Sequence, residues 1–387
     1  MAFDMGLNRE QIALQKMLRK FVENEIIPVR AQYDEKEEFP WPVVKKMQEL
    51  GLNCIVAPEK YNGFYYDSIT QCMIAEELCR GCTGIALAVL TNCLASEPLL
   101  IAGNDEQQDW WFTRACQEGK LQSFAVTEPG AGSNVAGIAT TARRDGDYYI
   151  INGTKCFITN GGVASQFTVL TSLDRSQGHK AMAFFIVDRE LEGVSIGKKE
   201  IKMGIRASNT VEVIFDNVRV PKKWLLGQEG EGFSIAMKTF DASRPLVGSL
   251  AVGLAQGAFE FARDYAKERM TFGKPIASYQ AIQFMLADMA MKIEAARLLV
   301  QKACWLMEQG LPGTMAASFA KCFGADMCME VTTDAVQILG GYGYSREYPV
   351  EKMMRDAKIL QIFEGTAQIQ RMIIAGHILA SHRQPTP

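Results

Sequence analysis

The sequence predicts an α+β protein made of three consecutive parts. These are an N-terminal α-helical domain over residues 1–120, a middle antiparallel β-barrel-like domain over 121–230, and a C-terminal antiparallel four-helix bundle over 231–387. Apolar residues recur at helical spacing in the first and last parts, whereas they alternate with polar residues in the middle part. The chain has 387 residues, 48% of them hydrophobic, so it can bury a large core.

Helix signals dominate the N-terminal part. A helix is predicted from Gln11 to Ile27, because its apolar residues keep helical spacing and Asn8 stands three residues before Gln11, as in a capping box. Further helices are predicted over residues 41–51, 68–78 and 84–102.

In the middle part the period of the pattern changes to two. Asn152-Gly153 lies between two alternating segments, so we expect a hairpin turn there. Three more strands are predicted in AMAFFIVD (181–188), VSIGKKEIKM (194–203) and TVEVIFDNVRV (210–220).

The C-terminal part returns to helical spacing. Long helices are predicted over residues 231–269, 278–309, 313–339 and 366–380. Short connections between long helices favour an antiparallel bundle.

Charge and composition exclude several classes of partner. The net charge is −3, and no basic stripe or polybasic tail indicates binding to nucleic acid or to an anionic membrane. The longest stretch of low charge, residues 83–103, contains Thr, Asn, Ser, Glu and Pro, and is expected to be a buried helix rather than a membrane span. The N-terminus has no basic and apolar signal regions. We therefore expect a bacterial cytoplasmic protein, although a processed mitochondrial matrix protein would have the same sequence features.

The ten cysteines are scattered singly, which is typical of free thiols in a reducing compartment. Cys79 and Cys82 have the spacing of a redox pair, and buried packing on a helix is the alternative for them. The chain has three histidines and no second cysteine pair at zinc-ligand spacing, so no metal site is expected.

One carboxylate stands alone in an apolar run. Glu364 is the only charged residue between Lys358 and Arg371, in the segment IFEGTAQIQ (362–370). An unpaired buried carboxylate is costly. Glu364 therefore either points to water or is held in a hydrophobic site for a chemical purpose.

The common nucleotide motifs do not match. No Gly-Lys pair is followed by Ser or Thr as a P-loop requires, and GAGSNVAG (130–137) has Val135 where a dinucleotide fingerprint needs glycine. A Rossmann nicotinamide site is therefore not expected. The glycines of this loop can still let backbone amides approach an anion or a flat ring.

Five segments in one order are more specific than any single motif. They are AVTEPGAGSN (125–134), FITNGG (157–162), ERMTFGKP (268–275), DAVQILGGYGYSREYPVEKMMRDAK (334–358) and IFEGTAQIQ (362–370). Along nearly its whole length the chain resembles the acyl-CoA dehydrogenase family, and within it the medium-chain and short-chain enzymes.

The resemblance implies non-covalently bound FAD in a homotetramer built as a dimer of dimers. Phe124, Thr127 and Ser133 match positions that line the flavin from the β-domain. Phe157 and Thr159 match the pair beside the flavin ring, although many relatives have Trp at the position of Phe157. Further matches to cofactor positions are Arg269, Thr271 and Phe272 at the pyrophosphate and adenine, Gln337 and Gly341 at the FAD of a neighbouring subunit, and Thr366 and Gln368.

The resemblance also places the catalytic base at Glu364. The implied reaction removes an α-proton from a saturated acyl-CoA, transfers a β-hydride to flavin N5 and passes electrons to electron-transfer flavoprotein. A poorly solvated carboxylate is a stronger base, and the Glu364 N–H would polarise the thioester carbonyl. Some relatives place the base at the position of Ser243, which cannot act as a carboxylate.

Other substrate contacts are implied around this base. Arg244 matches a position that meets the CoA portion and Asp241 would orient it, with a structural ion pair of the two as the alternative. The remaining substrate-site matches are Ser133, Phe363 and Gly365. Gly365 would also allow a tight turn, and Thr366 would cap the next helix.

The acyl tail is expected to point toward the helix over residues 84–99, which presents Leu87, Thr91 and Leu94 on neighbouring turns. No arginine lies between Arg80 and Arg114, so a dicarboxylic acyl group is disfavoured. A short, medium, branched or cyclic acyl group remains open, as does the physiological direction. The rival functions are an acyl-CoA oxidase, which usually has an extra C-terminal helical domain, an enoyl-CoA reductase and a non-catalytic flavin-binding relative.

Overall fold

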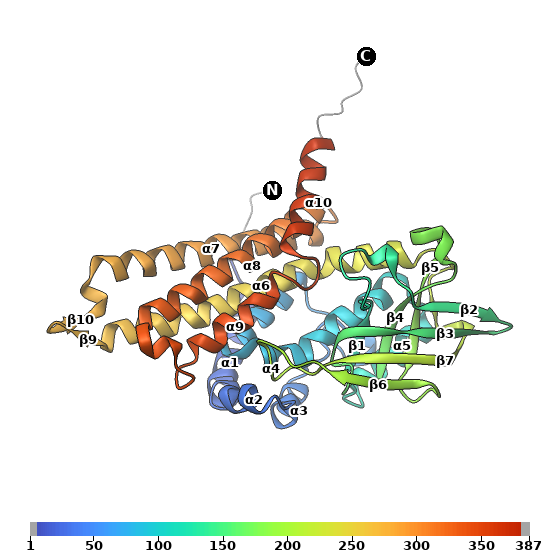
Figure 1. The fold of residues 1–387 in the computed structure, drawn as a ribbon, viewed down its shortest axis with the longest axis horizontal. Helices are drawn as coiled ribbons and strands as arrows, with labels where there is room; N and C mark the ends of the chain where they lie inside the picture. Colours follow the sequence, from blue (N-terminus) through green and yellow to red (C-terminus); the bar gives the residue numbers. More distant parts are fainter. Residues whose placement is uncertain (1–5, 381–387) are drawn as a thin grey trace, which may run out of the picture.

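The computed structural model describes residues 6–380, and these form a β-region flanked in sequence by two helical regions (Figure 1). The N-terminal region contains α1 (Arg9–Phe21), a π-helical turn (Val22–Ile26), α2 (Arg30–Lys36), α3 (Trp41–Glu49), α4 (Ser68–Ala102) and α5 (Asp105–Cys116). The capping box at the start of α1 is confirmed, since the side chains of Asn8 and Gln11 each accept the other residue's backbone N–H.

Helix α4 is kinked at Cys82, whose backbone is non-helical at φ −166° and ψ 112°. The two helices predicted over 68–78 and 84–102 lie on either side of this kink, so they are confirmed, and both extend closer to it than predicted. The Cys82 Sγ lies 3.2 Å from Nζ of Lys352 in α9 (Val350–Leu360). Cys79 and Cys82 are both buried free thiols, which favours packing over a redox role. Residues 6–380 contain no group of three or more side chains suited to hold a metal.

The middle region is a sheet in the strand order β6-β7-β3-β2-β4-β5-β8, with β1 beside β4. Its strands are β1 (Gln122–Ala125), β2 (Thr141–Asp145), β3 (Tyr148–Thr159), β4 (Gln166–Ser172), β5 (Met182–Asp188), β6 (Val194–Lys199), β7 (Thr210–Pro221) and β8 (Leu225–Leu226). The pairs are antiparallel except for β1–β4 and β2–β4. The predicted β-domain is therefore confirmed, with two parallel pairs that the sequence pattern did not predict.

The hairpin expected at Asn152-Gly153 was wrong. Strand β3 runs through both residues, and the turn before it contains Gly146, at φ 61°. Asn152-Gly153 instead forms an irregularity where the register of β3 against β7 shifts between Ile151 and Gly153. A β-carbon at Gly153 would lie 2.3 Å from Oγ1 of Thr140. The glycine is therefore required by close packing rather than by a turn.

The C-terminal region contains the expected long helices: α6 (Gly232–Glu268), α7 (Gln280–Glu308), α8 (Thr314–Leu339) and α10 (Ala367–Ala380). The additional helix α9 leads into the segment that carries Glu364, and the short hairpin β9–β10 (Met270–Thr271, Lys274–Pro275) joins α6 to α7. Figure 1 shows α6, α7 and α8 side by side and α10 projecting from the body of the molecule.

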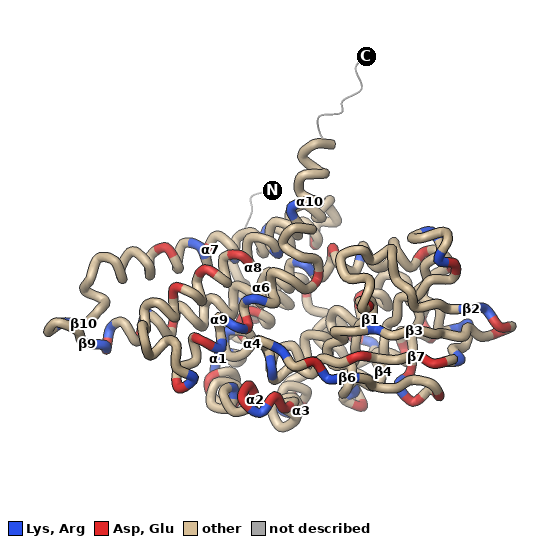
Figure 2. Tube along the Cα trace, in the orientation of Figure 1, with Lys and Arg blue, Asp and Glu red and all other residues tan. Residues whose placement is uncertain are grey.

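Two helices, α4 and α6, are long and apolar enough to cross a bilayer by length and composition. In each, 72% of the most apolar window is buried inside the protein, as expected of core helices. Basic and acidic residues are scattered among each other over the helices and the sheet (Figure 2).

A buried ion pair braces the loop after β1. Lys155, fully buried in β3, donates to Glu128 Oε1 at 2.8 Å. The Glu128 carboxylate also accepts the backbone N–H groups of Ala139 and Thr140 at 2.5 and 3.0 Å. One carboxylate thus satisfies three donors and holds residues 128–140 against β3.

Replacing Glu128 by Ala should leave two N–H groups without acceptors and a buried ammonium group without its carboxylate, with only the Val126 carbonyl as acceptor. We expect E128A to lower the free energy of unfolding, measured by urea denaturation, by about 3–5 kcal/mol. The control is E106A, because Glu106 forms an exposed pair with Lys223 and its loss should cost less than about 1 kcal/mol. Equal stability of the two variants would show that the buried pair does not brace the loop.

Candidate active site

Glu364 lies in the turn between α9 and α10, with a left-handed backbone at φ 52°, and Gly365 follows at φ 87°. The side chain is partly buried, and its Oε2 accepts a 2.6 Å hydrogen bond from Oγ of Ser243 in α6. The sequence left open whether this carboxylate points to water or is held inside the protein, and the structure supports the second alternative. Thr366 accepts the backbone N–H of Ile369 at 3.1 Å, as expected of a residue that caps α10.

Opposing influences act on the protonation of Glu364. Burial raises the pKa of the carboxyl above its ordinary value, while the Ser243 hydrogen bond and the positive charges of Lys321 and Arg244 act in the opposite direction. Burial is the larger influence, so the pKa is raised overall. This is the direction that a general base for a weak carbon acid requires.

The backbone N–H of Glu364 is unused within residues 6–380, since it donates to no acceptor there. The neighbouring N–H groups of Phe363 and Ala367 donate to Ile359 and Gln361. A free N–H beside a partly buried carboxylate can polarise a carbonyl oxygen of a ligand.

Arg244 lies next to Ser243 and is buried. Its guanidinium forms an ion pair with Asp241, whose other oxygen accepts a 2.7 Å hydrogen bond from Thr314. The structural ion pair that was the alternative for Arg244 is therefore present. Its buried Nε has no partner among the described residues, which leaves one donor for a ligand.

Leu87 and Thr91 are buried on α4, and the Thr91 hydroxyl donates to the Leu87 carbonyl at 2.6 Å. Between residues 77 and 99 only Leu94 and Glu97 are accessible. They are three residues apart and therefore share a face of the helix. This face opens toward the C-terminal end of α4, where residues 100–102 are also accessible.

Glu97 is a site residue that the sequence analysis missed. Burial raises its pKa to about 7, and the negative charge of Glu364 acts in the same direction. Because the charge of Glu364 acts on Glu97, Glu97 on α4 lies near the turn that carries Glu364. The only signal in the sequence was that Glu97 is the single charged residue between Arg80 and Asp105.

The predicted flavin-ring residues of the β-domain lie together. The Cys156 N–H donates to the Thr127 carbonyl at 2.9 Å, and Oγ of Ser123 donates to the Thr159 carbonyl at 2.5 Å. Phe124 packs edge-on against Phe240 of α6, with ring centroids 5.9 Å apart.

This group is connected to the catalytic turn through α6. The carbonyl of Phe240 lies 3.3 Å from the Ser243 hydroxyl, and that hydroxyl donates to Glu364. The β-domain group and the predicted base therefore border the same region.

Phe157 has the geometry of a contact for a flat ring. It is 63% exposed and has φ 56°, an unusual backbone for an aromatic residue. The register of β3 shifts between Lys155 and Ile158, and such bulges redirect side chains. Ser133 is exposed, and space is open beside Gly130 and Gly132 in the same loop. These features fit an isoalloxazine ring against the end of β3.

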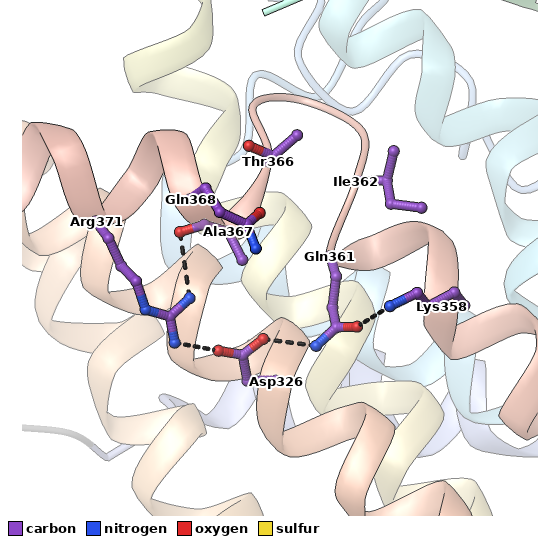
Figure 3. Close-up of a pocket in the computed structure, with 8 residues that line it drawn as sticks. All are labelled: Asp326, Lys358, Gln361, Ile362, Thr366, Ala367, Gln368 and Arg371. Atoms are coloured by element: carbon purple, nitrogen blue, oxygen red, sulfur yellow. Dashed lines mark hydrogen bonds and ion pairs between the residues drawn. The ribbon is translucent and has the colours of Figure 1, made fainter.

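Thr366 and Gln368 line a hollow of about 410 Å³ whose lining residues do not include Glu364 (Figure 3). At its base Asp326 accepts hydrogen bonds from Gln361 at 2.7 Å and from Arg371 at 2.6 Å. The hollow is bordered by both polar side chains predicted to bind the cofactor in this segment.

The remaining predicted cofactor residues lie elsewhere. Hairpin β9–β10, which carries Thr271 and Phe272, is at the end of the bundle away from the sheet (Figure 1). Phe272 is 97% exposed there. The guanidinium of Arg269 lies over the ring of Tyr342, 5.3 Å from the ring centroid. Tyr342 is next to Gly341 and close to the end of α8 that carries Gln337. One chain therefore does not bring this second group to Glu364.

Comparison with known proteins identifies the family. The N-terminal, middle and C-terminal domains of acyl-CoA dehydrogenase match residues 8–119, 123–218 and 230–379. The short-chain specific acyl-CoA dehydrogenase of Clostridium acetobutylicum is 44% identical over 379 residues, which cover 97% of this chain and 99% of that protein. The chain belongs to the acyl-CoA dehydrogenase family.

Solved structures agree with this assignment. Butyryl-CoA dehydrogenase from Megasphaera elsdenii superposes with a TM-score of 0.94 at 40% identity, covering 97% of this chain and 100% of the other. A second structure comes from work on the electron transferring flavoprotein of Acidaminococcus fermentans and flavin-based electron bifurcation. One of its chains superposes with a TM-score of 0.95 at 42% identity, covering 97% of this chain and 99% of that chain. As a member of this acyl-CoA dehydrogenase family, the protein is an FAD-dependent oxidoreductase.

Proposed function

We propose that this acyl-CoA dehydrogenase oxidises a short, uncharged acyl-CoA to the 2,3-enoyl-CoA, with Glu364 as the base that removes the α-proton. The observation that carries this proposal is the setting of Glu364: a partly buried carboxylate held by Ser243, on a residue whose own N–H has no acceptor among residues 6–380.

The turn would act on two neighbouring parts of the substrate, the α-carbon and the thioester carbonyl. The Glu364 carboxylate would take the proton from the α-carbon, and its raised pKa favours that transfer. The Glu364 N–H would donate to the thioester oxygen and stabilise the negative charge that develops there. FAD, when bound, supplies the acceptor for the β-hydride. Phe157 and Thr159 would hold its ring next to this region.

The wall of α4 supports an uncharged acyl group. Leu87 and Leu94 are apolar, and the Thr91 hydroxyl already donates within the helix. Glu97 is the titratable group on this face, and a carboxylate there would repel an acyl group that ends in a second carboxylate. The short-chain specific and butyryl-CoA enzymes among the relatives support a short chain.

The separation of the cofactor residues supports a homotetramer in which FAD bridges two chains. Arg269, Thr271, Phe272, Gln337 and Gly341 would then contact FAD bound mainly by another subunit. Apolar side chains on the bundle support self-association, because large exposed apolar patches mark interfaces. Met291 of α7 and Met372 of α10 are 63% and 68% exposed, and a hollow of about 620 Å³ lies between α7, α8 and α10.

We also propose electron-transfer flavoprotein as the electron acceptor, docking near the β-domain. The relative solved in work on that flavoprotein supports this partner.

The reaction is tested by anaerobic mixing of holoprotein with acyl-CoAs while the flavin absorbance is followed. We expect butyryl-CoA to bleach the flavin rapidly and glutaryl-CoA not to bleach it. E364Q should retain FAD but lower the bleaching rate by about 10²–10⁴-fold, because the amide cannot accept the proton. Unchanged bleaching by E364Q would remove Glu364 from the reaction.

The shared cofactor site is tested by subunit complementation. E364Q lacks the base, and R269A should bind FAD poorly. After unfolding and joint refolding, a mixed pair of chains contains one site with both intact residues, so we expect about one quarter of wild-type activity from random pairing. If the mixture shows no more activity than the two variants show separately, Arg269 and Glu364 serve a site within one chain, and the site shared between two chains is contradicted.

A further inference from the structure

Lys321 is a buried cation that the reaction described above does not use directly. It lies on α8, is fully buried, and its Nζ donates to the Gly365 carbonyl at 2.5 Å. Within residues 6–380 it has no carboxylate within ion-pair distance. Burial lowers its pKa to about 8, and the charge of Glu364 opposes that shift. A buried ammonium group without a paired carboxylate is costly, so its position calls for a physical explanation.

Gln370 contacts the same turn from α10. Its side chain is fully buried, and Nε2 lies 3.4 Å from the Glu364 carbonyl and 3.3 Å from the Gly365 carbonyl. A β-carbon at residue 365 would lie 2.6 Å from Nε2 of Gln370. The contact therefore depends on glycine at this position.

The two side chains hold the turn by its carbonyl groups. Glu364 and Gly365 both have left-handed backbones, which is unfavourable for glutamate and must be maintained by surrounding contacts. Because Lys321 and Gln370 bind carbonyl oxygens, they leave the Glu364 N–H unused.

Arg244 and Lys321 act on the carboxylate of Glu364, and the charge of Glu364 in turn acts on Glu97. Arg244 on α6 is already paired with Asp241. Glu97 on α4 is a carboxyl and cannot stabilise a second negative charge. Lys321 on α8 is the cation whose charge is not matched by its own ion pair within the described residues.

We propose that Lys321 and Gln370 are positioning residues for Glu364. Together they fix the turn so that the Glu364 N–H and carboxylate face the substrate, and the charge of Lys321 opposes protonation of that carboxylate. The inference rests on the proposed role of Glu364 as the base and adds how the base is held and kept ready.

The test uses three substitutions of Lys321 in the holoprotein. K321M removes the charge and the hydrogen bond, K321Q removes the charge but keeps a donor, and K321R keeps the charge. Loss of the cation should raise the pKa of Glu364. Because Glu364 must be ionised to act, activity should then be lost at a higher pH when the solution is acidified. The acidic limb of kcat/KM for butyryl-CoA should therefore move up by about one pH unit in K321M and K321Q, and return toward wild type in K321R.

A matched control separates this effect from a general loss of charge. K302M removes an exposed lysine of α7, and its acidic limb should stay at the wild-type position. Q370L should lower kcat without moving the limb, since it removes a tether but no charge. If K321M does not fold, K321Q carries the test. An acidic limb that stays at the wild-type position in folded, FAD-containing K321Q would overturn the role assigned to the charge of Lys321.

A second readout is independent of turnover. The carboxyl stretch of protonated Glu364 can be followed by infrared titration and assigned by its loss in E364Q. We expect the band to persist to higher pH in K321M and K321Q. If wild type oxidises no acyl-CoA but the band shifts as expected, the proposed reaction fails while the link between Lys321 and Glu364 stands. An unshifted band contradicts that link.

Discussion

The site depends on keeping one carboxylate ionised while most of its water is removed. Burial makes Glu364 a stronger base, because an unsolvated carboxylate gains more from taking up a proton. If nothing opposed the rise in pKa that burial causes, the carboxylate would become protonated at too high a pH. The Ser243 hydroxyl, the Arg244 guanidinium and the Lys321 ammonium supply that opposition. The chemistry therefore depends on helices α6 and α8 as much as on the turn that carries the base.

The close packing of α4 and α6 sets the position of Glu97 on α4 relative to Ser243 and Arg244 on α6. A β-carbon at Gly253 would lie 2.1 Å from the Glu76 carbonyl, and one at Gly257 would lie 2.3 Å from the Arg80 carbonyl. The two helices can approach this closely only because both positions are glycine. Their contact fixes the apolar wall of α4, with Glu97, relative to Ser243 on α6.

Much of the fold could be predicted from the sequence, because helical and alternating patterns report directly on burial. The α1 capping box and the long bundle helices were correct. Asn152-Gly153 was misread because a glycine required by packing has the same sequence signature as one in a turn. The kink of α4 at Cys82 lies between the two helices that the sequence predicted.

The base was found because Glu364 stands alone in an apolar run and matches a family motif. Lys321, Gln370 and Glu97 could not be found in this way. Each is a common residue on a helix, and its role follows from which neighbour it faces after folding. The split between the β-domain cofactor residues and those near Arg269 likewise becomes visible only when the chain is placed in space.

The most direct test of the central claim isolates proton removal from oxidation. Methylthioacetyl-CoA has α-hydrogens but sulfur in place of the β-carbon, so it offers no β-hydride. Incubated with holoprotein in D₂O and analysed by mass spectrometry, it should exchange its α-hydrogens for deuterium with wild type and not with FAD-containing E364Q. Equal exchange by both proteins would contradict the account, because another group would then be the base.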